Sequence, residues 1–412
     1  MAKIEPCTNS DLSIHLDWSQ PFLPGQKITG YVPRTSRWAS AETSISIALH
    51  GKCTTKFFSR DSYMCRSSLD LFGQEEVRYE LFNDPLHIQL SCPEGKMWRH
   101  PEPTSLRSHP LGRASYLPLL YVDKQALPPS FDLGSSNATT SRNGSAVVEY
   151  YLEAMITTPN SEPVMARMPI HLRCQSSPFP ITDFDIQIHS RQRYTINSPY
   201  LISAGTETVQ CSMGQKLGKV VGLSRSHRFT FRLDISVASV LQIGSPYHIP
   251  LEMRAIPQWE DTSECLSKTL PTIDIISFTL VLRSTSCILA FATAALGPAP
   301  VVREESFMEK ILLADYIYSK STKQIEERKY SSLNDSNSLT LPVNENTAPL
   351  DIGEVLDLKL QHEKFSVHEV PTFITYNIKR TYELEWKMRL EVGGETIKVK
   401  GKHPVLVMGR AG

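Results

Sequence analysis

Cysteine and histidine side chains are the first candidates for chemistry in this sequence. Cys92 with His100 and His109 offers one thiolate and two imidazoles, which are zinc ligands, but their spacing matches no standard zinc site. Cys53 and Cys65 offer a dithiol for redox chemistry. Exposed loop histidines and buried, reduced core thiols are the favoured interpretation of both groups. We therefore predict no metal ion and no cofactor.

Motifs for enzyme catalysis are missing from the sequence. It contains no G-x-S-x-G, G-x-x-x-x-G-K-[ST] or H-E-x-x-H motif. Glycines recur at 214–222, but no parallel strand precedes them and no helix follows, as a nucleotide site requires. An enzymatic alternative stays open, a carbohydrate-active β-sandwich with two carboxylates on one concave face. We predict that the protein is not an enzyme, with no catalytic residue to name.

Short pairs of cations recur along the chain and suit phosphorylated segments or anionic lipid headgroups. The favoured interpretation is the solvated side of strands, where lysine and arginine prevent edge-to-edge pairing. Lysine plus arginine number 43 and aspartate plus glutamate number 43, so no net field attracts nucleic acid. The pairs are Lys52 with Lys56, Arg191 with Arg193, Arg225 with Arg228, and Lys379 with Arg380.

Alternation of apolar and polar residues with a period of two dominates the sequence and predicts strands with one buried face. The clearest row has apolar residues at every second position from Tyr382 to Leu390, with charged residues between them. Gly393-Gly394 after this row predicts a two-residue hairpin turn. Further rows lie at 12–18, 45–49, 148–154, 184–188, 229–237, 249–255, 276–282, 356–360 and 397–399.

These rows predict an all-β protein of two tandem antiparallel β-sandwiches of the immunoglobulin-like class. Residues 175–180 separate two strand-rich halves, so we expect domains at 1–176 and 181–412. Segments 99–112, 134–145 and 331–349 are predicted to be polar loops, the last within the second domain.

Two segments are ambiguous. Residues 304–318 place apolar side chains at helical spacing, which fits a short helix as well as strands. Residues 284–302 carry no charge, but four Ser or Thr residues and two prolines favour a buried strand, a turn and a loop over a transmembrane helix. The first residues lack an apolar stretch, so we expect no signal peptide and a cytoplasmic protein.

The order of several sequence blocks resembles the arrestin family, and in particular its fungal and alpha-arrestin-like members. The blocks span nearly the whole chain, and their order and spacing carry the resemblance more than any single block. They are FLPGQKITGYV at 22–32, ISIALHGK at 45–52, LPPSF at 127–131, VVEYYLEA at 147–154, PIHLR at 169–173, GSPYHIPL at 244–251 and VPTFITYNIKRTYEL at 370–384.

The resemblance implies an adaptor that binds membrane transporters or receptors, or signalling proteins, for endocytosis or sorting, with recruitment to the plasma membrane or endosomes and a possible link to a ubiquitin ligase. It also implies a buried charged switch between the domains, for which Arg173 is the best-placed residue, although an ordinary surface arginine is the simpler interpretation. A scaffold without a trafficking role is the alternative.

The chain departs from the family pattern in three places. Glu94-Gly95 leads into a proline-rich loop where a phenylalanine-rich strand is usual. Segment 287–329 matches no block and is interpreted as an insertion. No Pro-Pro-x-Tyr motif is present, and the nearest sequence, PPSF at 128–131, lies inside the first domain, so recruitment of a ubiquitin ligase by that route is in doubt.

Overall fold

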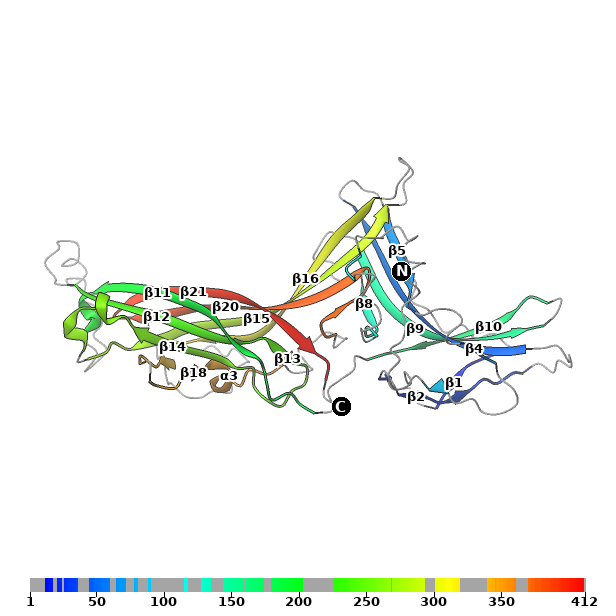
Figure 1. The fold of residues 1–412 in the computed structure, drawn as a ribbon, viewed down its shortest axis with the longest axis horizontal. Coiled ribbons are helices and arrows are strands. Elements are labelled where there is room, and N and C mark those ends of the chain that lie inside the picture. The colour runs from blue at the N-terminus through cyan, green and yellow to red at the C-terminus, as the bar shows by residue number, and fades with distance from the viewer. Residues whose placement is uncertain are drawn as a thin grey trace, which may run out of the picture.

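The computed structural model confirms an all-β protein built from long antiparallel strands (Figure 1). Within the described residues the only α-helix is α3 (Ile352–Val355), which has four residues. The structure describes residues 12–17, 21–23, 26–35, 44–59, 64–71, 78–80, 88–89, 115–117, 127–134, 144–158, 161–173, 179–202, 226–267, 269–292, 301–318, 339–344, 346–360 and 370–410.

The second half of the chain forms two sheets that face each other. Phe229, Phe231 and Leu233 on one sheet and Leu280 and Trp386 on the other belong to a single buried apolar cluster. One sheet contains, in order, β11 (Ile186–Ser198), β12 (His227–Ala238), β14 (Leu251–Pro257) and β18 (Leu350–Asp351). The facing sheet contains β15 (Ile273–Ala292), β20 (Ile378–Val392), β21 (Glu395–Met408) and β13 (Val240–Gln242).

The first half is organised around a second apolar cluster. Ile47, Leu152 and Ala166 from one sheet pack there with Leu12 and Ile28 from the opposite layer. The sheet contains β10 (Val164–Ile170), β9 (Gly144–Thr157), β4 (Ser44–Phe58) and β5 (Met64–Asp70), with β6 (Arg78–Glu80) and β8 (Phe131–Leu133). The opposite layer contains β1 (His15–Leu16), β2 (Lys27–Ile28), β3 (Gly30–Tyr31) and β7 (Ile88–Gln89).

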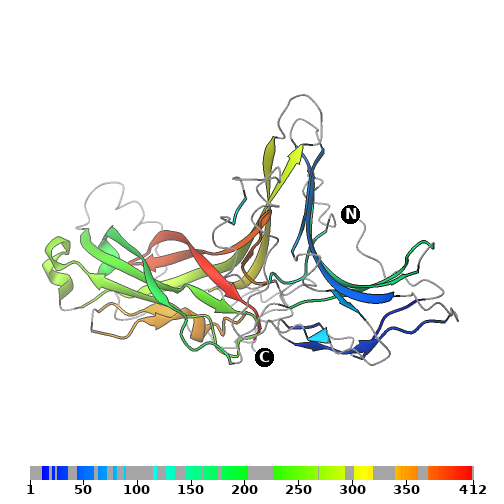
Figure 2. The ribbon, with the colours of Figure 1, turned by 45° about the vertical axis from the view of Figure 1, so that its right-hand side comes forward.

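Strand β15 joins the two halves. It has 20 residues, and its last two, Phe291 and Ala292, pair with Arg66 and Cys65 of β5, so that one sheet runs through both halves (Figures 1 and 2). Apolar residues from the second half of the sequence complete the core of the first: Ile288, Ala290, Val370, Phe373 and Ile378. The division into domains at 176 and 181 stays a prediction.

Segment 304–318 is a strand, so its interpretation as a helix is wrong. Strand β16 (Val302–Ile317) pairs antiparallel with β15 along almost its whole length. Its apolar residues mimic helical spacing because both faces of the strand carry them: Phe307 and Ile311 face inward, while Met308 and Leu312 are exposed. A bulge near Leu313 then shifts the alternation by one residue. This segment is therefore part of the main sheet, where an insertion was expected.

The uncharged segment at 284–302 contains the end of β15, which is the buried strand that we expected. The expected turn and loop fall on residues 293–300, which lie outside the described part. No helix among the described residues is long and apolar enough to cross a membrane. Gly393 and Gly394 form the predicted turn, both with positive φ, between the paired ends Val392 and Glu395.

Two other predictions need correction. The predicted loop at 331–349 contains strand β17 (Leu339–Leu341), which pairs with the start of β15; 331–338 lies outside the described residues. The row at 356–360 forms no strand. Its Leu358 and Leu360 are nevertheless buried, and their carbonyls accept the backbone N–H groups of Ile249 and Gly244. Of the other loops, 99–112 lies outside the described residues, as does most of 134–145 and of the linker.

We predict that Gly401→Ala destabilises the second sandwich. Gly401 lies directly opposite Trp386 in the β20–β21 pair, and a Cβ at Gly401 would lie 2.2 Å from the buried indole. Overpacking of this kind costs about 1–3 kcal/mol of unfolding free energy, measurable by urea denaturation. Thr396→Ala, at an exposed position of the same strand, is the control and should change stability by less than about 0.5 kcal/mol. Equal stability of the two variants would contradict the prediction.

Candidate functional site at the junction of the two halves

A buried arginine lies where the two halves meet. Arg380, at the start of β20, is 5% exposed. Its Nε donates to the hydroxyl of Tyr382 at 2.8 Å, its Nη1 to Ser286 Oγ at 2.9 Å, and its Nη2 to Glu309 Oε2 at 3.0 Å. Ser284 Oγ donates to the same glutamate oxygen at 3.2 Å. We call these five side chains the arginine centre.

The arginine centre connects strands from both halves. Ser284 and Ser286 belong to β15, Glu309 to β16, and Arg380 and Tyr382 to β20. The guanidinium also lies 5.5 Å from the ring centroid of Phe131 on β8, a strand of the first half. Tyr382 donates its hydroxyl proton to the carbonyl of Val370. A single cation thus links three strands of the second half to the first.

Burial and pairing shift the pKa of Arg380 in opposite directions. Burial lowers the pKa of Arg380, but Tyr382 and Glu309 raise it by more, so the net shift is upward and the guanidinium stays charged. Burial raises the pKa of Tyr382 despite the nearby cation, so the phenol keeps the proton that it donates. A buried ion is tolerated only when its hydrogen bonds are made, and removal of one partner leaves an uncompensated charge.

A second polar group, the asparagine centre, lies next to the first. Asn377 is fully buried; its Oδ1 accepts the thiol proton of Cys53 at 2.8 Å, and its Nδ2 lies 3.5 Å from Thr55 Oγ1 and 3.4 Å from Ser67 Oγ. The Asn377 carbonyl accepts the N–H of Leu289 at 2.8 Å. The asparagine centre therefore attaches the segment before β20 to β4, β5 and β15 at once.

Cys53 and Cys65, the cysteines of the first half that the structure describes, are core thiols, as the sequence indicates. Both are buried, and neither forms a disulfide bond. Burial raises the pKa of Cys53 to about 12, partly offset by its hydrogen bond with Thr375, and burial also raises the pKa of Cys65. Both thiols are therefore protonated at neutral pH and unreactive.

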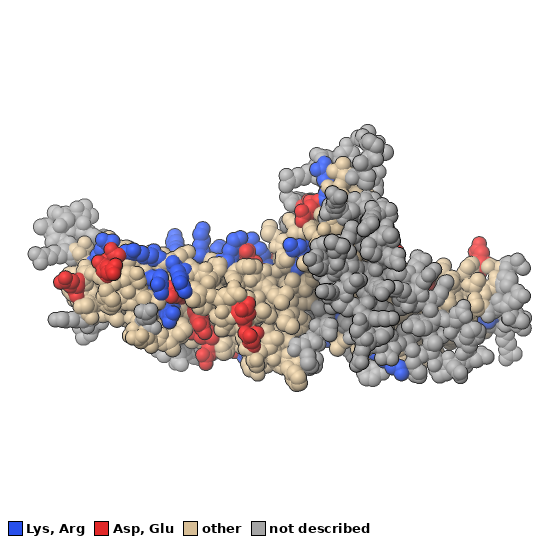
Figure 3. Space-filling view, viewed as in Figure 1, with Lys and Arg blue, Asp and Glu red and all other residues tan. Residues whose placement is uncertain are grey.

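The sheet of β16, β15, β20 and β21 has a second side, opposite the buried arginine, which faces solvent and combines cations with apolar side chains. Two pairs of cations lie directly opposite each other on β20 and β21, Lys387 with Lys400 and Arg389 with Lys398, and Lys402 follows on β21. Figure 3 shows lysine and arginine side chains gathered along this part of the molecule, over β11 and β21. We call these five residues the basic row. Like charges in opposite positions destabilise a sheet, which favours an anionic partner.

An apolar row runs along the neighbouring edge strand. On β16, Met308 is 64% exposed, Leu312 54% and Ile317 68%. The basic row and the apolar row lie on the same face of the sheet. Lys310, which alternates in step with Met308 and Leu312 on β16, pairs with Arg283 of β15. Arg283 in turn contacts Glu385 at 2.6 Å, and Glu385 alternates in step with Lys387 and Arg389 on β20. Within the described residues β16 pairs only with β15, which leaves its other edge open. We call this side of the sheet the outer face.

The cations of the predicted pairs that the structure describes are spread over four strands, β4, β11, β12 and β20. Arg173 is exposed, so it is the ordinary surface arginine of the simpler interpretation, and Arg380 is the buried one. Arg191, Arg193 and Arg228 are exposed, whereas Lys52, Lys56 and Lys379 are half-buried. Cys92, His100, His109 and Arg225 lie outside the described residues.

Sequence reasoning missed both the arginine centre and the basic row. Arg380 was assigned to a solvated strand face because it follows Lys379, although Arg380 shares the parity of the apolar row that begins at Tyr382. That parity was the available signal. The basic row was visible only as polar positions in two separate strands, and its density depends on the pairing of β20 with β21.

Comparison with known proteins gives likeness in structure but none in sequence. No family model matches the sequence, and no curated protein matches it. Among solved structures, the crystal structure of squid arrestin aligns over 99% of this chain and 98% of that chain, with 9% sequence identity and a TM-score of 0.31. A likeness at this level carries no argument about function, and membership of the arrestin family or of its fungal branch stays a prediction.

We predict that Arg380→Met destabilises the protein by about 3–5 kcal/mol, because Glu309 keeps its charge after the cation beside it is removed. The double variant Arg380→Met/Glu309→Gln should recover part of this loss, giving a large coupling energy in a double-mutant cycle by urea denaturation. Arg167→Met is the control: its ion pair with Glu153 is partly exposed, and its loss should cost less than about 1 kcal/mol. An equal cost for Arg380→Met and Arg167→Met would contradict the assignment.

The Cys53 thiol predicts a pH dependence of stability. Its pKa is about 12 in the folded protein against 9.0 when unperturbed. Above pH 9 the unfolded chain loses this proton first, so stability is complete below that pH and falls by up to about 1.4 kcal/mol per pH unit as the pH rises. Unfolding free energies at about pH 8 and about pH 10 should show a steeper fall for the parent than for Cys53→Ala. Cys265→Ala, at an exposed thiol, should keep the parent slope.

Proposed function

We propose that this protein is a non-enzymatic intracellular adaptor that binds other proteins on the outer face. The observation that carries the proposal is the combination, on one side of one sheet, of the basic row with the exposed apolar row of Met308, Leu312 and Ile317. An open strand edge beside apolar side chains suits an extended peptide that adds a strand. Opposed cations suit a peptide that is acidic or phosphorylated.

The arginine centre supports a regulatory role in the same adaptor. Strand β16 carries Glu309 toward Arg380 on one face and Met308 and Leu312 toward solvent on the other. A partner that moves β16 would therefore act on the ion pair, and an anion that competes for Arg380 would release the strand. This links partner binding to the junction of the two halves.

The partner that best fits this chemistry is the acidic or phosphorylated cytoplasmic segment of a membrane transporter or receptor. The role that follows is cargo selection in endocytosis or sorting at the plasma membrane or endosomes. A link to a ubiquitin ligase would need a route other than a Pro-Pro-x-Tyr motif. The basic row also suits peripheral contact with anionic lipid headgroups. A scaffold without a trafficking role is the alternative, and the classes of captured partner separate the two.

Two variants of the outer face test the proposal by proximity labelling in the native cell. Lys398→Glu/Lys400→Glu reverses part of the basic row, and Met308→Glu/Leu312→Glu charges the apolar row. Loss of a charge-assisted contact costs about 1.5–3 kcal/mol, so recovery of membrane proteins should fall at least about tenfold with either variant.

Matched controls lie elsewhere on the second sandwich. Ile186→Glu/Ile188→Glu charges two exposed apolar residues of β11, and Arg228→Glu reverses an exposed cation; both should retain the partners. Partners that include no membrane or trafficking protein would contradict the cargo role and favour the plain scaffold. Partners that survive both outer-face variants would contradict the assigned surface.

A further inference from the structure

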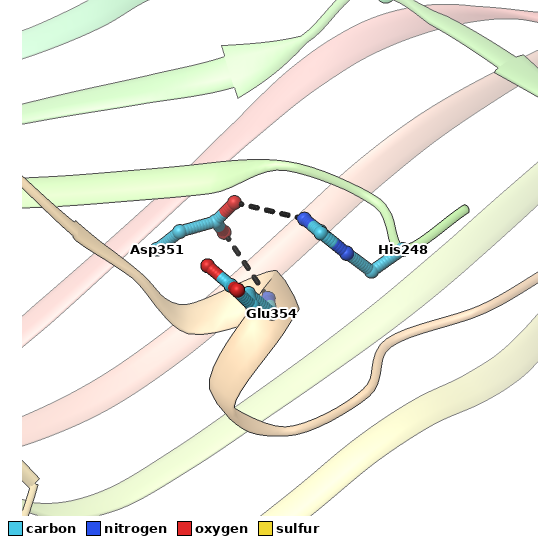
Figure 4. A group of neighbouring side chains, drawn as sticks. All are labelled: His248, Asp351 and Glu354. Carbon is cyan, nitrogen blue, oxygen red and sulfur yellow. Dashed lines mark hydrogen bonds and ion pairs between the residues drawn. The ribbon is translucent and has the colours of Figure 1, made fainter. Parts of the chain in front are cut away.

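Three side chains that are good metal ligands meet on the second sandwich: Asp351 and Glu354 are close in sequence, and His248 comes from a distant segment (Figure 4). His248 lies in the segment between β13 and β14, Asp351 ends β18, and Glu354 lies in α3. One ligand atom from each side chain lies within 4.8 Å of the other two. The outer face and the junction use none of these residues.

The aspartate is already oriented. Its Oδ1 accepts three backbone N–H groups, from Leu251 at 3.1 Å, Gly353 at 2.8 Å and Glu354 at 3.3 Å. Its Oδ2 faces His248 Nε2 at 3.2 Å (Figure 4). The hydrogen bonds to Oδ1 therefore fix the orientation of the carboxylate, and Oδ2 points at the imidazole. Metal ligands are commonly held in place by supporting hydrogen bonds of this kind.

The two segments that carry the ligands are also held together by backbone contacts. The N–H of Ile249 donates to the carbonyl of Leu358 at 2.6 Å, and β14 pairs with β18 at Glu252 and Asp351. Gly353 allows the closest approach, because a Cβ there would lie 1.8 Å from the carbonyl oxygen of Ile249. The positions of His248 and Asp351 are therefore set before any ligand binds, which lowers the cost of binding one.

We propose that His248, Asp351 and Glu354 bind a divalent cation of the zinc type. One imidazole nitrogen with two carboxylate oxygens is a mixed donor set that suits Zn²⁺, whereas Ca²⁺ and Mg²⁺ prefer six or more oxygen ligands. His248 is 37% exposed and Glu354 is exposed, so the ion is reached from solvent and keeps a coordination position for water or a partner's side chain. The bound ion would fasten α3 and β18 to the segment that precedes β14.

Isothermal titration of the full-length, chelator-treated protein with Zn²⁺ tests this site. All proteins carry Cys265→Ser, because the Cys265 thiol lies 3.2 Å from His227 and offers a second place for the metal. Affinity should weaken at least about tenfold in His248→Gln and in Glu354→Gln, since each removes one ligand. Glu260→Gln, which changes an exposed glutamate outside the cluster, is the matched control and should bind as the parent does.

Thermal unfolding gives an independent measurement. Zn²⁺ should raise the unfolding temperature of the parent and of Glu260→Gln, and should have a smaller effect on Glu354→Gln, whose side chain is exposed and whose substitution leaves the backbone contacts in place. Mg²⁺ in excess should not displace the zinc. Titration curves that are the same for the parent, His248→Gln and Glu354→Gln would overturn the proposal and leave an ordinary ion pair between His248 and Asp351.

Discussion

The cost of burying the charge of Arg380 constrains the middle of this molecule. A guanidinium that is 5% exposed needs acceptors on several sides, and here they come from three strands: Ser286 on β15, Glu309 on β16 and Tyr382 on β20. Those strands can hold only one relative placement without leaving a charge unpaired. The hydrophobic clusters on either side supply most of the stabilisation, but apolar packing alone tolerates many arrangements. The ion pair selects one of them.

The strand content of this protein is strongly encoded because alternation over ten or more residues suits a half-buried strand and fits a helix poorly. The row from Tyr382 to Leu390 became the buried face of β20, and Gly393-Gly394 became its turn. Short or two-faced rows were harder to interpret. Segment 304–318 has apolar residues on both sides of a strand and then a bulge, which together imitate a helix. Ile186 and Ile188 alternate correctly yet are exposed, because β11 is the edge of its sheet and a register shift follows at Ser190.

The candidate sites were less accessible to sequence reasoning than the strands, because each depends on pairing between distant segments. Asn377 contacts residues more than 300 positions away, and no local pattern predicts that. Lys387 opposite Lys400 follows only once the β20–β21 register is known. His248 and Asp351 are brought together by the pairing of β14 with β18. Arg380 differs from these, because its parity with the apolar row beginning at Tyr382 was a local signal of its burial, although the favoured interpretation placed it on a solvated strand face.

Strand β15 also affects the order in which the molecule can be assembled during synthesis. The apolar interior of the first half includes Ile288, Ala290 and Ile378, so a nascent chain that ends at residue 180 lacks part of its own core. Contacts this distant in sequence form slowly, and chains usually fold in units as they leave the ribosome. The first half must therefore remain incomplete, with apolar surface uncovered, until most of the second has emerged. A protein with this connectivity has a special need for protection by chaperones while it is translated.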